Sequence, residues 1–268
     1  MKDHLDSAST QALNVSMARP INASVIGSPF LTTVRLHEDR VVEGAHPFTI
    51  RSIMRGLPLT FSTPVTFLVG ENGSGKSTLL EALAWALGFS DQGGDRTNAY
   101  AEGADGHALG RALALSWRKR VAGGFFLRAE TFFNYARHLE ALGSAFSLYD
   151  GIPLNQRSHG EAFLALFQNR FEDGTYLLDE PEAALSPSRQ LTFLSVLHDL
   201  AQSRAAQLII ATHSPILLTL PGARVLSCSD AGIKEIDYRD TEHFRLTRDF
   251  LNAPERYLRH LFDADEER

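Results

Sequence analysis

The sequence predicts an α/β fold in which a mainly parallel central sheet is flanked by helices. Three observations lead to this prediction. The apolar run 65–69 ends in a glycine-rich turn that leads directly into a helical pattern at 77–87. Two further apolar runs, 176–180 and 207–213, lie on either side of a helical pattern at 188–204. Strands that alternate with helices along a chain usually form a parallel sheet with both faces covered.

The N-terminal part adds short β segments before this core. Residues 1–25 are polar and rich in Ser, Ala and Asn, which predicts a flexible arm. Short strands are expected around 30–35, 48–53 and 57–61. They predict an antiparallel β subdomain on the N-terminal side of the core.

The stretch between the glycine-rich turn and residue 176 is mixed in character. Residues 91–110 contain five glycines among polar residues and predict a loop. Alternation at 111–117 and an apolar run at 124–130 predict strands. Apolar residues then recur at helical spacing, so we expect a small inserted helical subdomain over 131–172.

The last helical pattern follows Pro254 and places Leu258, Leu261 and Phe262 on one face, which predicts a helix that docks on the core. With 268 residues and no internal repeat, residues 1–268 are expected to form a single domain.

The composition excludes several classes of protein. A net charge of −6 gives no general attraction to nucleic acid or to anionic membranes. No run approaches the ~20 apolar residues that a membrane-spanning helix needs, and the N-terminus lacks the apolar core of a signal peptide. Cys228 is the only cysteine, which fits a reducing compartment. We therefore expect a cytoplasmic protein.

The turn after the first core strand fits the phosphate-binding pattern G-x-x-x-x-G-K-[ST] at every fixed position. Its glycines allow backbone N–H groups to point at phosphate oxygens, and the following helix N-terminus adds a partial positive charge. Lys76 is expected to reach the β- and γ-phosphates, and Ser77 to ligate Mg²⁺. The predicted nucleotide-binding residues here are Gly70, Glu71, Asn72, Gly73, Ser74, Gly75, Lys76, Ser77 and Thr78.

Two later strands end in side chains suited to phosphate chemistry. The run 176–180 ends in Asp179 and Glu180, which point to opposite sides of the strand. Asp179 is expected to hold Mg²⁺, and Glu180 to orient or deprotonate the attacking water. The run 207–213 ends in His213, at the sheet edge where open α/β sheets place their ligands. His213 is expected to contact the γ-phosphate.

Together these three motifs resemble the ATP-binding-cassette (ABC) ATPases, a superfamily of P-loop NTPases. The resemblance extends to 157–161, which stands where that family carries its Leu-Ser-Gly-Gly-Gln signature: Ser158 and Gly160 match, whereas His159 and Glu161 depart. In the family this segment closes over the nucleotide of a second subunit. The resemblance therefore implies that Ser158 and Gly160 bind nucleotide across an ATP-dependent, head-to-tail homodimer.

Two other positions depart from the family pattern. Glu130 stands where the family has a glutamine near the metal, so the resemblance implies that Glu130 engages Mg²⁺ or its water. Ser186 replaces an aspartate that follows the Asp-Glu strand and serves communication across the dimer.

The motifs look most like the soluble branch of the superfamily, which includes RecF-like, chromosome-maintenance (SMC) and OLD-type ATPases. This chain has too little sequence for the long coiled coil of the SMC members, and too little after His213 for the nuclease domain of OLD-type members. The resemblance implies an ATP-driven conformational switch in DNA maintenance or phage defence. Residues 118–120 are basic, which fits either a DNA contact or a solvated strand end.

Two alternatives remain open. The first alternative to the soluble ATPase is the ATP-binding subunit of a transporter, which predicts a membrane partner. The second is an ATP-dependent interaction module that does not hydrolyse ATP. The departures at Glu130, His159, Glu161 and Ser186 favour the second alternative. The intact Asp179, Glu180 and His213 argue against it. A small-molecule kinase is disfavoured because it would have no use for the Asp-Glu strand.

Overall fold

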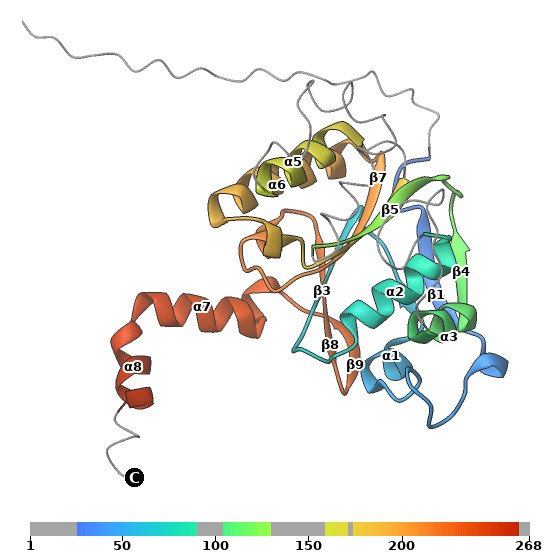
Figure 1. Ribbon diagram of the computed structural model, residues 1–268, viewed down its shortest axis with the longest axis horizontal. Helices are drawn as coiled ribbons and strands as arrows, with labels where there is room; N and C mark the ends of the chain where they lie inside the picture. The colour runs from blue at the N-terminus through green and yellow to red at the C-terminus, as the bar shows by residue number, and fades with distance from the viewer. Residues whose placement is uncertain (1–25, 90–103, 130–158, 171–173, 263–268) are drawn as a thin grey trace, which may run out of the picture.

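The computed structural model describes residues 26–89, 104–129, 159–170 and 174–262 (Figure 1). A central sheet of six strands has the order β5-β6-β7-β3-β8-β9. Every neighbouring pair in it is parallel except β8 and β9, which are antiparallel. The strands are β3 (Val65–Val69), β5 (Gly123–Arg128), β6 (Gly174–Asp179), β7 (Ala206–Ala211), β8 (Arg224–Ser229) and β9 (Gly232–Glu235).

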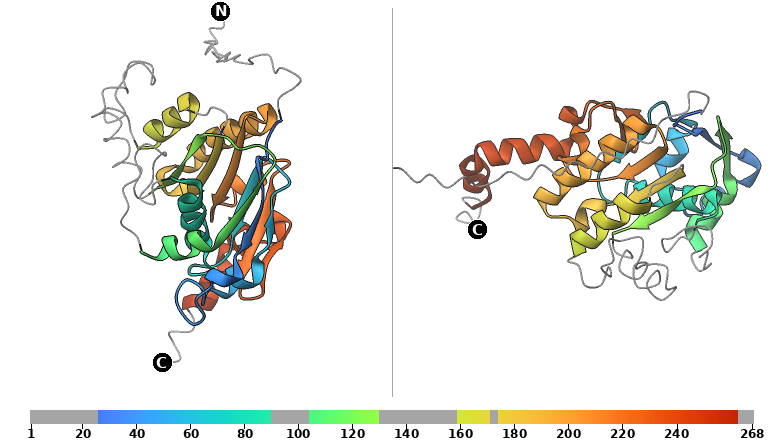
Figure 2. Two further views of the ribbon diagram at one scale, coloured as in Figure 1. Left: turned by 90° about the vertical axis from the view of Figure 1, so that its right-hand side faces the viewer. Right: turned by 90° about the horizontal axis from the view of Figure 1, so that it is seen from above.

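Helices cover both faces of this sheet (Figures 1 and 2). Helices α5 (His159–Arg170) and α6 (Pro187–Ser203) pack on one face, where Phe67 of β3 points. Helices α2 (Lys76–Leu87) and α3 (Ala104–Ala112) pack on the other, where the next residue of the strand, Leu68, points. Because both faces are covered, all residues of β3, β6 and β7 are buried, which explains why their sequences are mainly apolar and do not alternate with polar residues.

A second sheet, of order β2-β1-β4, is antiparallel and lies on the α2 side. It consists of β1 (Leu31–Leu36), β2 (Leu59–Thr60) and β4 (Leu113–Trp117). The buried amide of Gln207 in β7 joins the start of β1 to the central sheet. It accepts hydrogen bonds from the backbone N–H groups of Phe30 and Leu31 and donates one to the Leu31 carbonyl. The mainly parallel core and the N-terminal antiparallel sheet are confirmed.

Two local predictions are wrong. The expected strand at 48–53 is instead helix α1 (Arg51–Gly56), which buries Ser52 and Ile53 beneath the glycine-rich loop. The expected loop at 91–110 is helical from Ala104 onward. In α3, Gly110 serves close packing, since a Cβ atom there would lie 2.7 Å from Cε3 of Trp85. A glycine at such a contact gives the same sequence signal as a glycine in a turn.

Short 3-10 helices lie in the connections between these elements, at Glu38–Arg40 (η1), Pro181–Ala184 (η4), Leu217–Thr219 (η5) and Tyr238–Asp240 (η6). The predicted arm at 1–25 lies outside the described residues. Of the predicted helical subdomain at 131–172, only α5 lies within them. Among the helices that are described, none has both the length and the apolar character needed to cross a bilayer.

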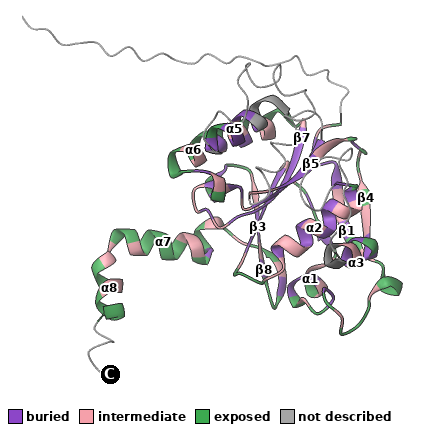
Figure 3. Cartoon of the chain, viewed as in Figure 1, coloured by how far each residue is buried: buried purple, intermediate pink, exposed green. Residues whose placement is uncertain are grey.

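The C-terminal helices α7 (Glu242–Asn252) and α8 (Pro254–Phe262) extend away from the body of the protein (Figure 1). Neither contains a buried residue, and Figure 3 shows mostly exposed positions along both. The helix expected after Pro254 is present, but its predicted docking on the core is wrong. Leu261 and Phe262 are 63% and 65% exposed to solvent, because α8 follows α7 outward and does not fold back onto the core.

Candidate nucleotide-binding site

The glycine-rich loop connects the carboxyl end of the central strand β3 to the first turn of α2. Gly73 and Gly75 adopt φ angles of 78° and 90°, which side-chain-bearing residues rarely adopt. A Cβ atom at Gly75 would also lie 2.6 Å from Cγ2 of Ile50. Below the loop, the Ser52 hydroxyl donates a hydrogen bond to the Ser74 carbonyl. The loop is therefore held in one shape by its glycines and by α1.

Lys76 closes this loop from within. Its Nζ donates hydrogen bonds to the carbonyl oxygens of Gly70 at 2.7 Å and Glu71 at 2.9 Å. The residue is only 4% exposed, and this burial lowers the pKa of the Lys76 ammonium. The lysine and the loop backbone thus form a compact unit at the start of α2, which also carries Ser77 and Thr78 in its first turn.

The last residue of β6 meets the first turn of α2. The Ser77 hydroxyl donates a hydrogen bond to Oδ1 of Asp179 at 3.1 Å. Burial raises the pKa of the Asp179 carboxyl to about 6, partly opposed by the nearby Arg128 guanidinium. Arg128 places Nε 3.5 Å from Oδ2 of Asp179, and its other end donates to Glu81 of α2. Two oxygen donors suited to a hard cation therefore lie together at this edge.

Arg128 was not among the predicted site residues. It ends β5, and it pairs in register with Asp179 at the end of β6. Carboxyl ends of adjacent parallel strands share one sheet edge. A basic residue at the end of a predicted strand was therefore a usable signal.

Glu180 sits at a strained turn immediately after β6. Its φ and ψ of 49° and 52° lie in the left-handed region, which is costly for a residue with a side chain. Its backbone N–H donates to the Ala211 carbonyl at 2.9 Å, so the turn is tied to the end of β7. Oε1 of Glu180 lies 3.5 Å from Nε2 of His213. Backbone strain of this kind is typical of functional sites.

His213 is held at both its backbone and its ring. Its backbone N–H donates to Oε1 of Glu182 at 2.6 Å. Its Nδ1 forms a hydrogen bond of 2.6 Å with Nε2 of His243, the second residue of α7. Burial, followed by the Lys76 charge, lowers the pKa of both imidazoles. Neither Glu182 nor His243 was predicted, and for His243 the sequence offers no signal.

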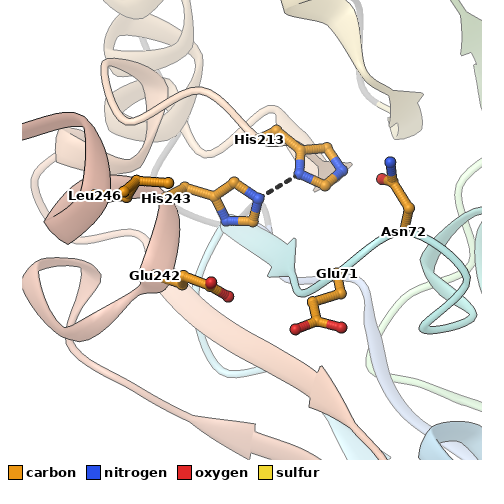
Figure 4. Close-up of a pocket in the computed structure, with 6 residues that line it drawn as sticks. All are labelled: Glu71, Asn72, His213, Glu242, His243 and Leu246. Carbon is orange, nitrogen blue, oxygen red and sulfur yellow. Dashed lines mark hydrogen bonds between the residues drawn. The ribbon is translucent and has the colours of Figure 1, made fainter. Parts of the chain in front are cut away.

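A cavity of about 340 Å³ joins the glycine-rich loop to the start of α7 (Figure 4). Its lining residues come from the loop, from the end of β7 and from α7: Glu71, Asn72, His213, Glu242, His243 and Leu246. The space lies beside the side chains expected to act on a terminal phosphate. Three of the predicted site residues, Glu71, Asn72 and His213, therefore border this cavity.

The remaining predicted residues are placed differently. Glu130 and Ser158 lie outside the described residues. Gly160 lies in the first turn of α5, where a Cβ atom would be 2.6 Å from Cδ of Arg189. Within the described ranges, no cluster of three His, Cys, Asp or Glu side chains could hold a metal by itself. A metal would therefore depend on Ser77 and Asp179, completed by water and phosphate oxygens.

Two protein-family models match this chain. Residues 49–112, which include the glycine-rich loop, match a family described as "AAA domain". Residues 161–219 match a family described as "AAA domain, putative AbiEii toxin, Type IV TA system", which includes Asp179, Glu180 and His213.

Similar solved structures include "a putative metal-chelate type ABC transporter" in an inward-facing conformation, at 18% identity and TM-score 0.46, covering 81% of this chain and 87% of that one. The SMC head domain from Thermotoga maritima is 15% identical, with TM-score 0.43, covering 78% and 98%. A dimeric bacterial ABC transporter cassette is 16% identical, with TM-score 0.38, covering 79% and 99%. TM-scores below 0.5 do not establish a shared fold, so these three structures support no statement about the activity of this protein.

Proposed function

We propose that the chain is a P-loop ATPase of the ABC type, and that it binds ATP with Mg²⁺ and hydrolyses it. The observation that carries this proposal is the meeting of three separate motifs at one sheet edge. Ser77 contacts Asp179, and Glu180 lies beside His213. A site that only bound nucleotide would have no need of a carboxylate next to the histidine.

Each residue has a distinct part in the proposed reaction. Lys76 and the loop N–H groups bind and neutralise the β- and γ-phosphates. Glu180 accepts a proton from the attacking water or orients it, and His213 donates a hydrogen bond to the γ-phosphate. The partial positive charge at the start of α2 adds to the same neutralisation. Most of the catalysis is therefore positioning and charge compensation.

The residues present fit a magnesium ion. The Ser77 hydroxyl and the Asp179 carboxylate supply two hard oxygen ligands 3.1 Å apart, and water and phosphate oxygens would complete the set. When bound, Mg²⁺ would neutralise charge that develops on the phosphate oxygens. Glu130 is a further candidate ligand, or a ligand of the metal-bound water.

The energy of hydrolysis is proposed to drive a conformational switch. Ser158 and Gly160 would bind the nucleotide of a second copy, so that ATP closes a homodimer and hydrolysis reopens it. The description of the second matched family names a toxin and a type IV toxin–antitoxin system. We therefore place defence ahead of DNA maintenance as the process that the proposed switch serves. A net charge of −6 gives DNA binding no general support. We propose a cytoplasmic location for this switch.

The test is phosphate release from ATP by the purified protein, with Mg²⁺ and with EDTA. The proposal predicts release that requires Mg²⁺ and is lost in Lys76→Ala. The matched control is Lys234→Ala, since Lys234 is exposed on β9. Tight ATP binding without any release would instead favour the non-hydrolysing module. Co-purification with a membrane partner would favour a transporter subunit.

A further inference from the structure

The first turn of α7 is held in shape by a cap at its N-terminal end. Thr241, which is 3% exposed, donates from Oγ1 to the Tyr238 carbonyl and accepts a hydrogen bond from the Phe244 N–H. The rings of Tyr238 and Phe244 then pack edge to face with centroids 5.2 Å apart. These contacts hold the backbone of the turn that carries His243, independently of any contact that the His243 ring makes.

The rings of His243 and His213 meet at a hydrogen-bonding distance (Figure 4). Nε2 of His243 lies 2.6 Å from Nδ1 of His213, and the rings are inclined at 71°. At this distance one nitrogen must carry the hydrogen and the other must accept it. This choice decides which ring nitrogen of His213, Nδ1 or Nε2, is a hydrogen-bond donor.

The other side of His213 favours one arrangement. Its Nε2 is buried, has no hydrogen-bond partner in the described part of the chain, and lies 3.5 Å from Oε1 of Glu180. A bare Nε2 would direct its lone pair at that carboxylate and at an incoming phosphate. An Nε2–H group instead presents a donor to both.

We infer that His243 is a positioning residue that donates its Nε2–H to Nδ1 of His213 and so holds His213 in the Nε2–H tautomer, ready to donate to the γ-phosphate. This inference rests on the proposed ATPase function. His243 does not touch the phosphate itself and acts through His213. It gives α7, an element far along the chain from the motifs, a direct part in the site.

The charges around the pair agree with this assignment. Burial, followed by the Lys76 charge, lowers the pKa of both rings, which favours the neutral form of each. Glu180 faces His213, while Glu242 and Glu71 line the cavity beside His243. Glu182 is occupied by the His213 backbone N–H. When both rings are neutral, the tautomer of His213 is set by the groups that face its two nitrogens. These groups are His243 at Nδ1 and Glu180 at Nε2.

The kinetic test compares three variants with the wild type. His243→Leu removes the donor, and we expect kcat to fall at least tenfold while KM for ATP stays within about twofold. His243→Gln places an amide N–H near the former Nε2 position, so it should restore kcat to within about threefold of wild type. His260→Gln, an exposed histidine on α8, is the matched control and should be unchanged. Unchanged kcat in His243→Leu, or an equal loss in His243→Gln, overturns the inference.

A spectroscopic test does not depend on turnover. Long-range ¹H–¹⁵N correlation spectra of histidine-labelled protein report which ring nitrogen carries hydrogen. We expect the Nε2–H tautomer for His213 in the wild type and in His243→Gln, and a mixture of tautomers in His243→Leu. An Nδ1–H tautomer of His213 in the wild type overturns the inference. Absence of ATP hydrolysis with the expected tautomer would refute the proposed function and leave the role of His243 supported.

Discussion

The Ser77 hydroxyl and the Asp179 carboxylate lie 3.1 Å apart, although 102 positions separate them in the sequence. The contact joins the first turn of α2 to the carboxyl end of β6. It places two oxygen ligands next to the loop that would hold the phosphates. The carboxylate is 5% exposed, and the nearby Arg128 guanidinium only partly offsets the effect of its burial. Its ionised form is therefore costly in the metal-free protein.

Replacing Asp179 with asparagine should stabilise the metal-free protein. Burial raises the pKa of Asp179 from 3.8 to about 6, so the folded state holds this proton more tightly than the unfolded state. The associated stability is present below about pH 4 and is lost as pH rises through about 6. Asp179→Asn should raise the free energy of unfolding at pH 7 by up to about 3 kcal/mol, and much less near pH 4. Urea unfolding in EDTA at the two pH values measures this. A loss of stability at pH 7 would contradict it.

Gly75→Ala should weaken both the fold and nucleotide binding. The new Cβ would meet Cγ2 of Ile50 at 2.6 Å, in a backbone conformation that alanine disfavours. We expect a loss of roughly 2–4 kcal/mol in the free energy of unfolding and at least tenfold weaker ATP binding, because the loop must shift. Gly44→Ala is a matched control, since Gly44 has a similar φ of 76° and no atom within 4 Å of the added Cβ. Equal effects of the two substitutions would mean that the contact with Ile50 is unimportant.

Gln207→Leu should destabilise the protein without touching the nucleotide site. The amide makes three hydrogen bonds to the backbone of Phe30 and Leu31, and all of these groups are buried. Leucine leaves them without a partner, at a cost of about 2–4 kcal/mol in the free energy of unfolding. Thermal and urea unfolding measure the change, with the exposed Gln202→Leu as control. A change below about 1 kcal/mol would show that the two sheets are joined by other contacts.

Glu180→Gln should trap an ATP-bound dimer if the head-to-tail arrangement is correct. This variant is expected to bind ATP without hydrolysing it, so closed dimers would accumulate. Light scattering with and without Mg²⁺-ATP measures the mass. Addition of Ser158→Ala to the trapped variant should weaken dimerisation if that residue binds nucleotide across the interface. A variant that stays monomeric with ATP would mean that closure needs another protein.

The sequence allowed most of the core and the three motifs to be predicted. The segments 65–69, 176–180 and 207–213 are mainly apolar because both sheet faces are covered, and their polar residues lie mostly at the strand ends. Parallel strands bring their carboxyl ends together, so the approach of Ser77, Asp179 and His213 followed from the topology.

The errors have physical causes. The 48–53 segment alternates enough to indicate a strand, but burial of Ile53 and the contact of Ser52 with the loop stabilise a single helical turn and a half. Gly110 is required by contact with Trp85 and not by a turn. His243 could not be predicted, because its approach to His213 depends on how α7 leaves the sheet. The prediction that the helix containing Leu261 docks on the core is wrong for the same reason, because the direction of α7 also sets the position of α8.

The most direct test of the proposed ATPase is phosphate release by wild type and Glu180→Gln. Because Glu180 lies beside His213 and carries no structural ion pair with a lysine or arginine in the described residues, its amide should preserve the site. We expect Mg²⁺-dependent release by the wild type, a fall of at least about a hundredfold in kcat for Glu180→Gln, and ATP affinity within a few-fold. Glu43→Gln, at an exposed position, should behave as wild type. Equal release by Glu180→Gln and wild type would contradict the assigned role of Glu180, and no release by the wild type would contradict the ATPase itself.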